Sequence, residues 1–564
     1  MARSTLLPTT VILLTFHPMP VDAQAPLRTP RVTGSVIVAP TPVVTSDGVV
    51  LAYELHLTNR DNRPLTLTRL EVLREDGSVL LRREDSLLHQ HLGRGMSGRA
   101  LRGAERAELP AGSWAIAWMW IMVRDTAAVP RLLRHRLTME LEDRTGARRE
   151  SVREVGSIAP GPPAIELGPP MGEGLWKAAR ISNTSGHRRG IDEGGHIPQR
   201  FAIDFSRIDD FGRNRTSDLF VNENHFAFGA PVLAVADGIV LSAADSMAEN
   251  SVGRQPVRHF PATLGNYVDL EIAPGVYALY LHLQSGSVTV RAGDTVTRGQ
   301  AIGRLGNTGA SIAPHLHFQL NTRSLPAGRS ERGQLGEGLP FVFSSYALVG
   351  ENGIPHCRCE GTECSARPLD MREHEMPMDG QVVRFVSDSG GAPGESEPTG
   401  VRRDALCHVA AGLLLRDEHR IPEAVAAYER AVTLDPGLEV PALQFGALCW
   451  RGSLWEFAEE VMGVCNQAVA TEPDHPDLKR RRALARALTG DLVGAVADLD
   501  EYLAWLSTEP PLATWEASFD GLASRSVETL RAQVMEWSRA LREGRNPFTS
   551  DVLEALRNRT RPPQ

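Results

Sequence analysis

The stretch Pro314-His315-Leu316-His317-Phe318 follows a glycine-rich run, GRLGNTGAS, at residues 303–311 of this 564-residue chain. Successive side chains of a β-strand point to opposite faces, so His315 and His317 would project from one face and converge on one point. That arrangement is typical of metal ligands. A lone His-x-His pair also occurs as two hydrogen-bonded polar residues on a sheet, so the interpretation depends on the sequence around it.

The region around this stretch, residues 172–350, is made of short apolar runs separated by glycines, with almost no helical periodicity. Such a pattern predicts an antiparallel β domain. Besides the stretch at 314–318, four further strings stand out in it: RFAID at 200–204, FGAPVLAVADG at 228–238, YLHL at 280–283 and VTRGQAIG at 296–303.

Taken in order, these five strings resemble the lysostaphin-type zinc endopeptidases, also called LytM-like murein hydrolases, over residues 199–345. The resemblance implies a small antiparallel β-sheet domain with a groove. It also implies one Zn²⁺ that activates water to cleave peptide bonds in the stem peptides or cross-bridges of bacterial peptidoglycan. Such a site needs three protein ligands and an open position for water.

The resemblance also assigns roles to single residues. Asp204 matches the aspartate ligand of the family and His317 its histidine ligand. His282 and His315 match the two histidines that do not bind the metal, which are expected to orient the water, take its proton and stabilise the oxyanion.

One position departs from the family pattern, because its His-x-x-x-Asp motif would place histidine where this chain has Arg200. A guanidinium has no lone pair for Zn²⁺ at neutral pH. Either another histidine completes the site, or the site is a degenerate scaffold that binds peptidoglycan or regulates other hydrolases without catalysis. The candidate third ligands are His187, His196 and His225; we favour His187 because residues 176–189 are polar and rich in Gly and Ser, like loops that line grooves.

The whole chain is predicted to be a multidomain protein in which β domains precede an α-helical one. Alternating segments at residues 31–158, separated by turn residues, predict an N-terminal β-sandwich. A Pro- and Gly-rich stretch at 159–170 separates it from the peptidase-like domain, and residues 351–400 are predicted to be a linker that contains a cysteine cluster.

Residues 401–545 change to helical periodicity and resemble tetratricopeptide repeats. Asp435-Pro436, Glu472-Pro473 and Glu509-Pro510 recur at intervals of 37 residues, and each marks the end of a predicted helix. A small helical bundle is the alternative. In either case the region is expected to offer a surface to a protein partner rather than a catalytic site.

The six cysteines are few for this length, so no disulfide framework is expected. Cys357, Cys359 and Cys364 form a cluster for which one disulfide is favoured over a metal site, and Cys407, Cys449 and Cys465 are expected to be small core residues.

The net charge of the chain and the sequence of its N-terminal residues indicate where the protein is found. The net charge of -9 gives no basic footprint for nucleic acid or anionic lipid. Residues 1–25 have one early positive charge, a short apolar run and small-residue cleavage patterns, as in a secretory signal peptide, and no segment is long enough to span a membrane. We therefore expect an exported protein of the periplasm or cell envelope.

Overall fold

The computed structural model describes the parts of the chain that carry its domains. These are residues 30–93, 102–142, 147–191, 196–216, 221–253, 261–325, 336–351, 354–360, 363–385, 400–508 and 527–560. The predicted signal peptide lies outside the described residues, and so does the third repeat marker, Glu509-Pro510.

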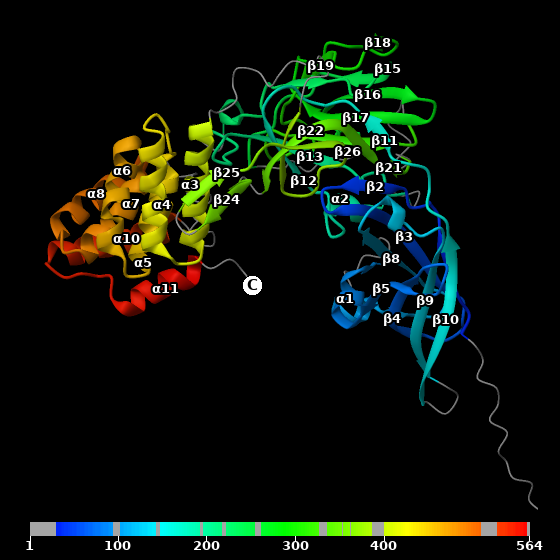
Figure 1. Cartoon of the computed structure of the whole chain (residues 1–564). Coiled ribbons are helices and arrows are strands. Elements are labelled where there is room, and N and C mark those ends of the chain that lie inside the picture. The colour runs from blue at the N-terminus through cyan, green and yellow to red at the C-terminus, as the bar shows by residue number, and fades with distance from the viewer. Residues whose placement is uncertain are drawn as a thin grey trace, which may run out of the picture. The chain divides into compact units, whose positions relative to one another are not determined.

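The N-terminal region contains two five-stranded sheets (Figure 1). One has the strand order β1-β3-β8-β6 with β2 beside β3, and the other has the order β10-β9-β4-β5 with β7 beside β4. The elements are β1 (Val32–Val36), β2 (Pro42–Thr45), β3 (Gly48–Asn59), β4 (Leu65–Leu73), β5 (Val79–Glu84), α1 (Asp85–Gln90), β6 (Leu92–Gly93), β7 (Glu108–Leu109), β8 (Trp114–Val123), β9 (Leu133–Glu142) and β10 (Arg148–Ile158). The predicted β character of residues 31–158 is confirmed, whereas the packing of the two sheets as a sandwich stays a prediction.

The chain divides into two compact units. One comprises Met1–Ala39, Tyr53–Trp118 and Pro130–Ala159, and the other comprises Pro40–Ala52, Met119–Val129 and Pro160–Gln564. The predicted peptidase-like domain and the helical region therefore both belong to the second unit.

The second unit contains a sheet whose main path is β11-β22-β27-β12-β13-β20-β17-β16-β15-β18. All of its pairs are antiparallel except β11 with β22. The strands on this path are β11 (Ile165–Leu167), β12 (Leu175–Ala179), β13 (Ile203–Ile208), β15 (Gly238–Ala244), β16 (Asn266–Ala273), β17 (Val276–Leu283), β18 (Thr295–Val296), β20 (Leu316–Asn321), β22 (Phe341–Glu351) and β27 (Gln381–Phe385). Strands β21 (Gly338–Leu339), β23 (Ile354–Pro355) and β26 (Asp370–Glu375) pair beside it, while β14 (Pro231–Leu233) pairs with β19 (Ala301–Arg304).

Strand β20 shows how the sequence fixes the orientation of this sheet. Leu316, Phe318 and Leu320 alternate along the strand and all pack into the main hydrophobic core. Shifting the strand by one residue would place this apolar set on the opposite face, so burial of the set specifies the register. His317 and Gln319 consequently lie on the other face.

The segment predicted as a linker, residues 351–400, differs in the structure. Strands β23 to β27 occupy much of residues 354–385, and β27 pairs with both β12 and β22 inside the sheet. The strand β24 (Cys357–Glu360) forms a hairpin with β25 (Glu363–Ala366). The acidic and glycine-rich composition that indicated a linker belongs to residues 386–399, which lie outside the described residues.

The C-terminal region is helical, as expected. Consecutive helices pack in pairs: α3 on α4, α5 on α6 and α7 on α8. Asp435 and Glu472, two of the repeat markers, directly follow α4 and α6, but membership of the tetratricopeptide class stays a prediction. The helices are α3 (Gly400–Asp417), α4 (Ile421–Leu434), α5 (Ala442–Leu454), α6 (Ala458–Thr471), α7 (Pro476–Leu488), α8 (Leu492–Thr508), α10 (Val527–Arg542) and α11 (Ser550–Thr560).

All six cysteines are paired in three disulfides, whereas a single disulfide, within the cluster of Cys357, Cys359 and Cys364, was favoured from the sequence. Cys359–Cys364 lies inside the predicted cluster and joins opposed residues of the β24–β25 hairpin. Cys357–Cys407 joins this hairpin to α3, and Cys449–Cys465 joins α5 to α6. Cys407, Cys449 and Cys465 are buried, as core residues should be, but their partners are distant in sequence, so spacing alone could not reveal the pairs.

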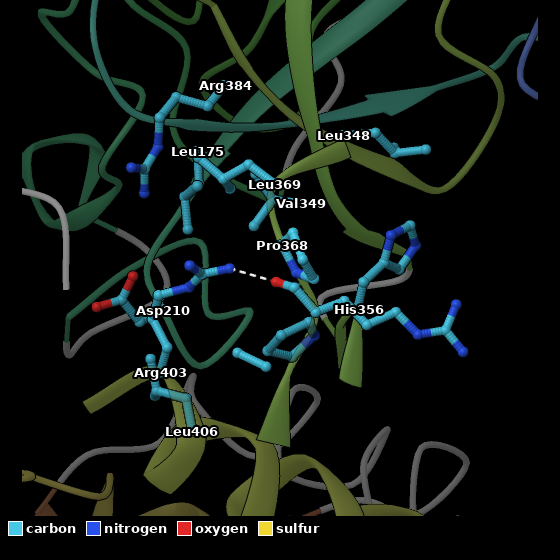
Figure 2. Close-up of a pocket in the computed structure, with 13 residues that line it drawn as sticks. Leu175, Asp210, Leu348, Val349, His356, Pro368, Leu369, Arg384, Arg403 and Leu406 are labelled. Carbon is cyan, nitrogen blue, oxygen red and sulfur yellow. Dashed lines mark hydrogen bonds between the residues drawn. The ribbon is translucent and has the colours of Figure 1, made fainter. Parts of the chain in front are cut away.

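A pocket lies beside α3, lined by residues of that helix and of strands β12, β22 and β27 (Figure 2). Its lining combines apolar side chains with Asp210, His356, Arg384 and Arg403. The Arg403 guanidinium donates a hydrogen bond to the carbonyl oxygen of Arg367 across the pocket, at 2.6 Å.

In the described residues, no helix is both long and apolar enough to cross a membrane.

The Cys357–Cys407 disulfide should stabilise the helical region considerably. It closes a loop with a sequence separation of 50 residues, for which the loss of chain entropy in the unfolded state amounts to ~4 kcal/mol. We expect Cys407→Ser to lower the free energy of unfolding of the helical region by about that amount, measured by urea denaturation followed by far-ultraviolet circular dichroism. Ala410→Ser, at another buried position of α3, is the matched control. Free thiols in the denatured, unreduced wild-type chain would contradict the pairing.

Candidate functional site

Two central strands bring the first pair of predicted site residues together. In the antiparallel pairing of β13 with β20, Asp204 lies directly opposite His317. The Nδ1 atom of His317 is 2.9 Å from Oδ1 of Asp204. Because Phe205 and Phe318 face the hydrophobic core, the alternation of the strands directs Asp204 and His317 to the opposite face.

His187 joins this pair from a separate segment. It lies on the one-turn helix α2 (Gly186–Arg189), whose N-terminus is capped by the Ser185 hydroxyl, which accepts a hydrogen bond from the backbone N–H of Arg188 at 3.1 Å. The Arg188 side chain is buried and anchors the turn. The Nε2 atom of His187 is 3.6 Å from Oδ2 of Asp204, and the ligand atoms of His187, Asp204 and His317 all lie within 4.8 Å of one another.

The other two predicted histidines line the same site. The ring of His282 is centred 4.9 Å from that of His315 and 5.9 Å from that of His317. Nδ1 of His282 lies 2.8 Å from the carbonyl oxygen of Thr308, and Nδ1 of His315 lies 2.9 Å from that of Ala313. Since a carbonyl only accepts hydrogen bonds, each Nδ1 carries a proton, and the neutral form of either ring has its lone pair on Nε2.

The backbone of His282 is held in an unusual conformation, with φ at +66°. A residue other than glycine in this left-handed region costs roughly 1–3 kcal/mol and persists only where its surroundings fix it. Here the N–H of His282 donates to the carbonyl oxygen of Leu264 and its own carbonyl accepts from Gly306 N–H, at 3.2 and 3.1 Å. The strained conformation thus directs the imidazole toward the site.

Arg200 does not take part in this cluster. Its guanidinium is buried and donates to Oε2 of Glu337 at 2.6 Å and to the carbonyl oxygen of Gly338 at 3.0 Å. The residue that occupies the histidine position of the family motif is therefore an internal cross-link between two loops. Its charge is compensated by Glu337.

Burial sets the protonation of the site. It lowers the pKa of His187 to about 4, assisted by the charge of His317 and opposed by that of Asp204. Burial likewise brings the pKa of His282 well below its ordinary value, together with His315 and His317. Burial alone would raise the pKa of Asp204, but His315, His317 and His187 outweigh it and lower that pKa. At neutral pH His187 and His282 are neutral and Asp204 is ionised.

The donor set suits a zinc ion. Two imidazole nitrogens and one carboxylate oxygen converge, and this is the set that Zn²⁺ takes in sites with an open position. Among the described residues this is the single group of three or more His, Cys, Asp or Glu side chains close enough to share a metal. The alternative candidates His196 and His225 are not in it.

Sequence reasoning missed the residues that support the cluster. Thr308, whose carbonyl holds His282, lies in the glycine-rich run, where no side-chain pattern marks a backbone contact. Gln319 was also missed; its Oε1 lies 2.7 Å from Nε2 of His317. Gln319 could have been found from the sequence, because it lies two residues after His317 and side chains two residues apart on a β-strand share one face.

These observations point to the same family as the sequence strings do. Residues 223–328 match the sequence model of Peptidase family M23. This region includes His282, His315 and His317, whereas Asp204 and His187 precede it. The mostly β architecture around the site agrees with this match.

Several known proteins are similar to this part of the chain. "Peptidoglycan DD-endopeptidase ShyA" of Vibrio cholerae is 36% identical over 98 residues, which cover 17% of this chain and 19% of that protein. "Glycyl-glycine endopeptidase ALE-1" of Staphylococcus capitis is 34% identical over 135 residues, 24% of this chain and 30% of that protein. The chain thus spans less than a third of the length of these relatives.

Among solved structures, the catalytic domain of lysostaphin from Staphylococcus simulans is 26% identical, covering 30% of this chain and 86% of that chain with a TM-score of 0.15. The similarity in sequence is what supports a peptidase domain of the lysostaphin-like, peptidoglycan-endopeptidase type.

The environment of Arg200 predicts what histidine would do in its place. Arg200→His removes the cation that pairs with the nearly buried Glu337, and breaking such a pair costs about 3–5 kcal/mol. We expect a lower midpoint of urea unfolding and no gain in zinc affinity, measured by competition with a chelator. Arg200→Lys, which keeps the charge, should lose less stability. A zinc affinity that rises by orders of magnitude in Arg200→His would identify position 200 as a lost ligand position.

Proposed function

We propose that the domain at residues 172–350 is a zinc metalloendopeptidase that hydrolyses peptide bonds of bacterial peptidoglycan. His187, Asp204 and His317 hold the metal, and His282 and His315 act on water and substrate. The observation that carries this proposal is the convergence of His187, Asp204 and His317 within 4.8 Å, with the rings of His282 and His315 beside them. The relatives named above support the substrate class.

His282, next to the metal ligands, has the protonation that a general base needs. The chemistry that bound zinc supplies to such a site is a water pKa lowered toward about 7 and a polarised carbonyl oxygen. His282 is neutral, and its Nδ1–H is held by the Thr308 carbonyl, so Nε2 can accept a proton from the attacking water. The resulting imidazolium can then donate that proton to the leaving amine.

His315 is held in the same way and also lies close to Asp204. Its Nε2 atom is 3.6 Å from Oδ1 of Asp204, and Nδ1 is held by the Ala313 carbonyl with the Ser311 hydroxyl 3.3 Å away. In a protonated state, its Nε2–H could donate to the oxyanion that forms on the scissile carbonyl. Fixed donors of this kind contribute most when they need no reorganisation during the reaction.

The non-catalytic alternative depends on Arg200 standing in a ligand position. Its guanidinium is instead bound to Glu337 and Gly338, and His187 supplies an imidazole to the cluster in its place. We therefore favour the enzyme over a degenerate module that binds peptidoglycan or regulates other hydrolases.

Export is part of the proposal. Structural disulfides persist in oxidising compartments and are rare in the cytosol, and this chain has three of them with no free cysteine. Together with the predicted signal peptide at residues 1–25, this supports action in the periplasm or cell envelope.

Metal content and turnover should separate the two kinds of site residue. We expect the purified chain to bind one zinc ion, and Asp204→Ala, His317→Ala and His187→Ala to lose it. His282→Ala should keep the metal and reduce the release of peptide ends from purified peptidoglycan by roughly 10²–10⁴-fold, the contribution typical of a general base. Elemental analysis and a chemical assay for new amino termini provide the two measurements.

The exposed His374 on β26 offers a control for these substitutions, because it lies outside the cluster. His374→Ala should leave both zinc content and turnover unchanged. Stoichiometric zinc in an Asp204→Ala, His317→Ala double variant would refute the ligand assignment, and a folded wild-type chain without zinc would refute the enzyme.

The predicted signal peptide can be tested by locating the mature N-terminus. Because small-residue patterns follow the apolar run, we expect the mature chain to begin near Gln24 or Pro26 and to be found outside the cytoplasm. Mass spectrometry of the N-terminal peptide after cell fractionation makes the measurement. Intact Met1–Gln24 on protein from the cytoplasm would argue against export.

A further inference from the structure

A line of buried polar side chains continues along β20 behind the candidate ligands. His317, Gln319 and Asn321 occupy alternate positions, so they share one face, and each is at most 2% exposed. Three buried polar residues in succession on a central strand are costly unless they bond to one another. Here they do: Nε2 of Gln319 donates to Oδ1 of Asn321 at 2.7 Å, and Oε1 of Gln319 faces His317.

A main-chain carbonyl fixes which way the Gln319 amide points. Nε2 of Gln319 lies 3.3 Å from the carbonyl oxygen of Pro198, and this oxygen can only accept a hydrogen bond. The amide nitrogen must therefore face Pro198, which leaves Oε1 to face Nε2 of His317 at 2.7 Å. An acceptor at this place requires that Nε2 of His317 carries a proton. Its Nδ1, which faces Asp204, is then the nitrogen available for a metal.

The loop that presents the Pro198 carbonyl is itself held by Arg200. The Arg200 guanidinium donates to Glu337 and to Gly338, as described above. The backbone N–H of Ile197 donates to Oε2 of Glu337 at 3.3 Å, and Gly338 N–H donates to the carbonyl oxygen of Ile197 at 3.0 Å. These bonds tie Ile197 and Arg200, which flank Pro198, to residues 337–338.

We infer that Gln319 is a positioning residue for the metal site, held in place by the loop that Arg200 anchors. It keeps the proton of His317 on Nε2, so that Nδ1 faces the metal. The inference rests on the proposed function, since it concerns the ligand His317. The inference also gives Arg200 a role. The family motif has a metal ligand at this position, whereas in this chain Arg200 supports the ligand His317 through Pro198 and Gln319. Residues that orient a histidine ligand in this manner change metal affinity by about 10–100-fold when they are replaced.

The test compares two substitutions of Gln319 with a matched control in the full chain. Gln319→Met keeps the size and removes the acceptor, whereas Gln319→Glu keeps an acceptor next to His317. Gln381→Met is the control, because Gln381 is an equally buried glutamine whose amide bonds to Met378 and Ser46, apart from the cluster. Zinc affinity is measured by chelator competition. The proton on Nε2 of His317 is observed by nitrogen-15 NMR of zinc-loaded protein labelled at histidine.

We expect Gln319→Met to lower zinc affinity by about 10–100-fold and to lose the protected Nε2–H signal. Gln319→Glu should retain both within a few-fold, and Gln381→Met should change neither. Unchanged zinc affinity in Gln319→Met, or an equal loss in Gln381→Met, would overturn the inference while leaving the proposed function intact. If Gln319→Met does not fold, Gln319→Glu decides: a retained signal supports the inference and a lost signal overturns it. A wild-type chain that binds no zinc would instead refute the proposed function.

Discussion

The opposition of Asp204 and His317 across β13 and β20 is the constraint on which the candidate site depends. It follows from the register of the two strands, and the register follows from the apolar residues on their other face, which fill the core of the sheet. A slip of one residue would bury both charged positions among aromatic rings and is therefore strongly disfavoured. The chemistry of the domain is consequently specified by the same alternation that makes the sheet stable.

Residues that share a strand or a short motif were predictable, because local geometry relates them. His315 and His317 follow from the period of two, and Asp204, His282 and the family assignment follow from strings whose order matches a known family. His187 reaches the cluster from a one-turn helix 17 residues before Asp204, and no spacing rule fixes where such a loop folds. The choice of His187 over His196 and His225 thus rested on composition alone. The disulfides Cys357–Cys407 and Cys449–Cys465 and the pairing of β27 with β12 and β22 depended on contacts distant in sequence.

Arg200 illustrates how a departure from a family motif can be absorbed. Loss of an imidazole at that position would leave a site with too few ligands, unless another part of the chain provides one. In this structure His187 reaches Asp204 from α2, and the buried arginine joins two loops through Glu337. A buried ion pair contributes little net stability compared with an apolar pair but is costly to break. The arginine at position 200 therefore holds the loop at residues 197–200 in place more than it raises the stability of the fold.

The electrostatics of the cluster favour a cation between its residues. Gln319 directs the Nε2 proton of His317 away from Asp204, so the Nδ1 lone pair and the carboxylate face each other 2.9 Å apart. Two acceptors at this distance repel unless a positive charge lies between them. Without a metal that charge is a second proton, which is why the pKa of His317 is raised: burial opposes it, but the hydrogen bond and the charge of Asp204 prevail. Metal and proton compete for one lone pair, while His187, with its low pKa, needs no deprotonation at neutral pH. A divalent cation that displaces a single proton from His317 therefore meets three ligands already in their binding forms.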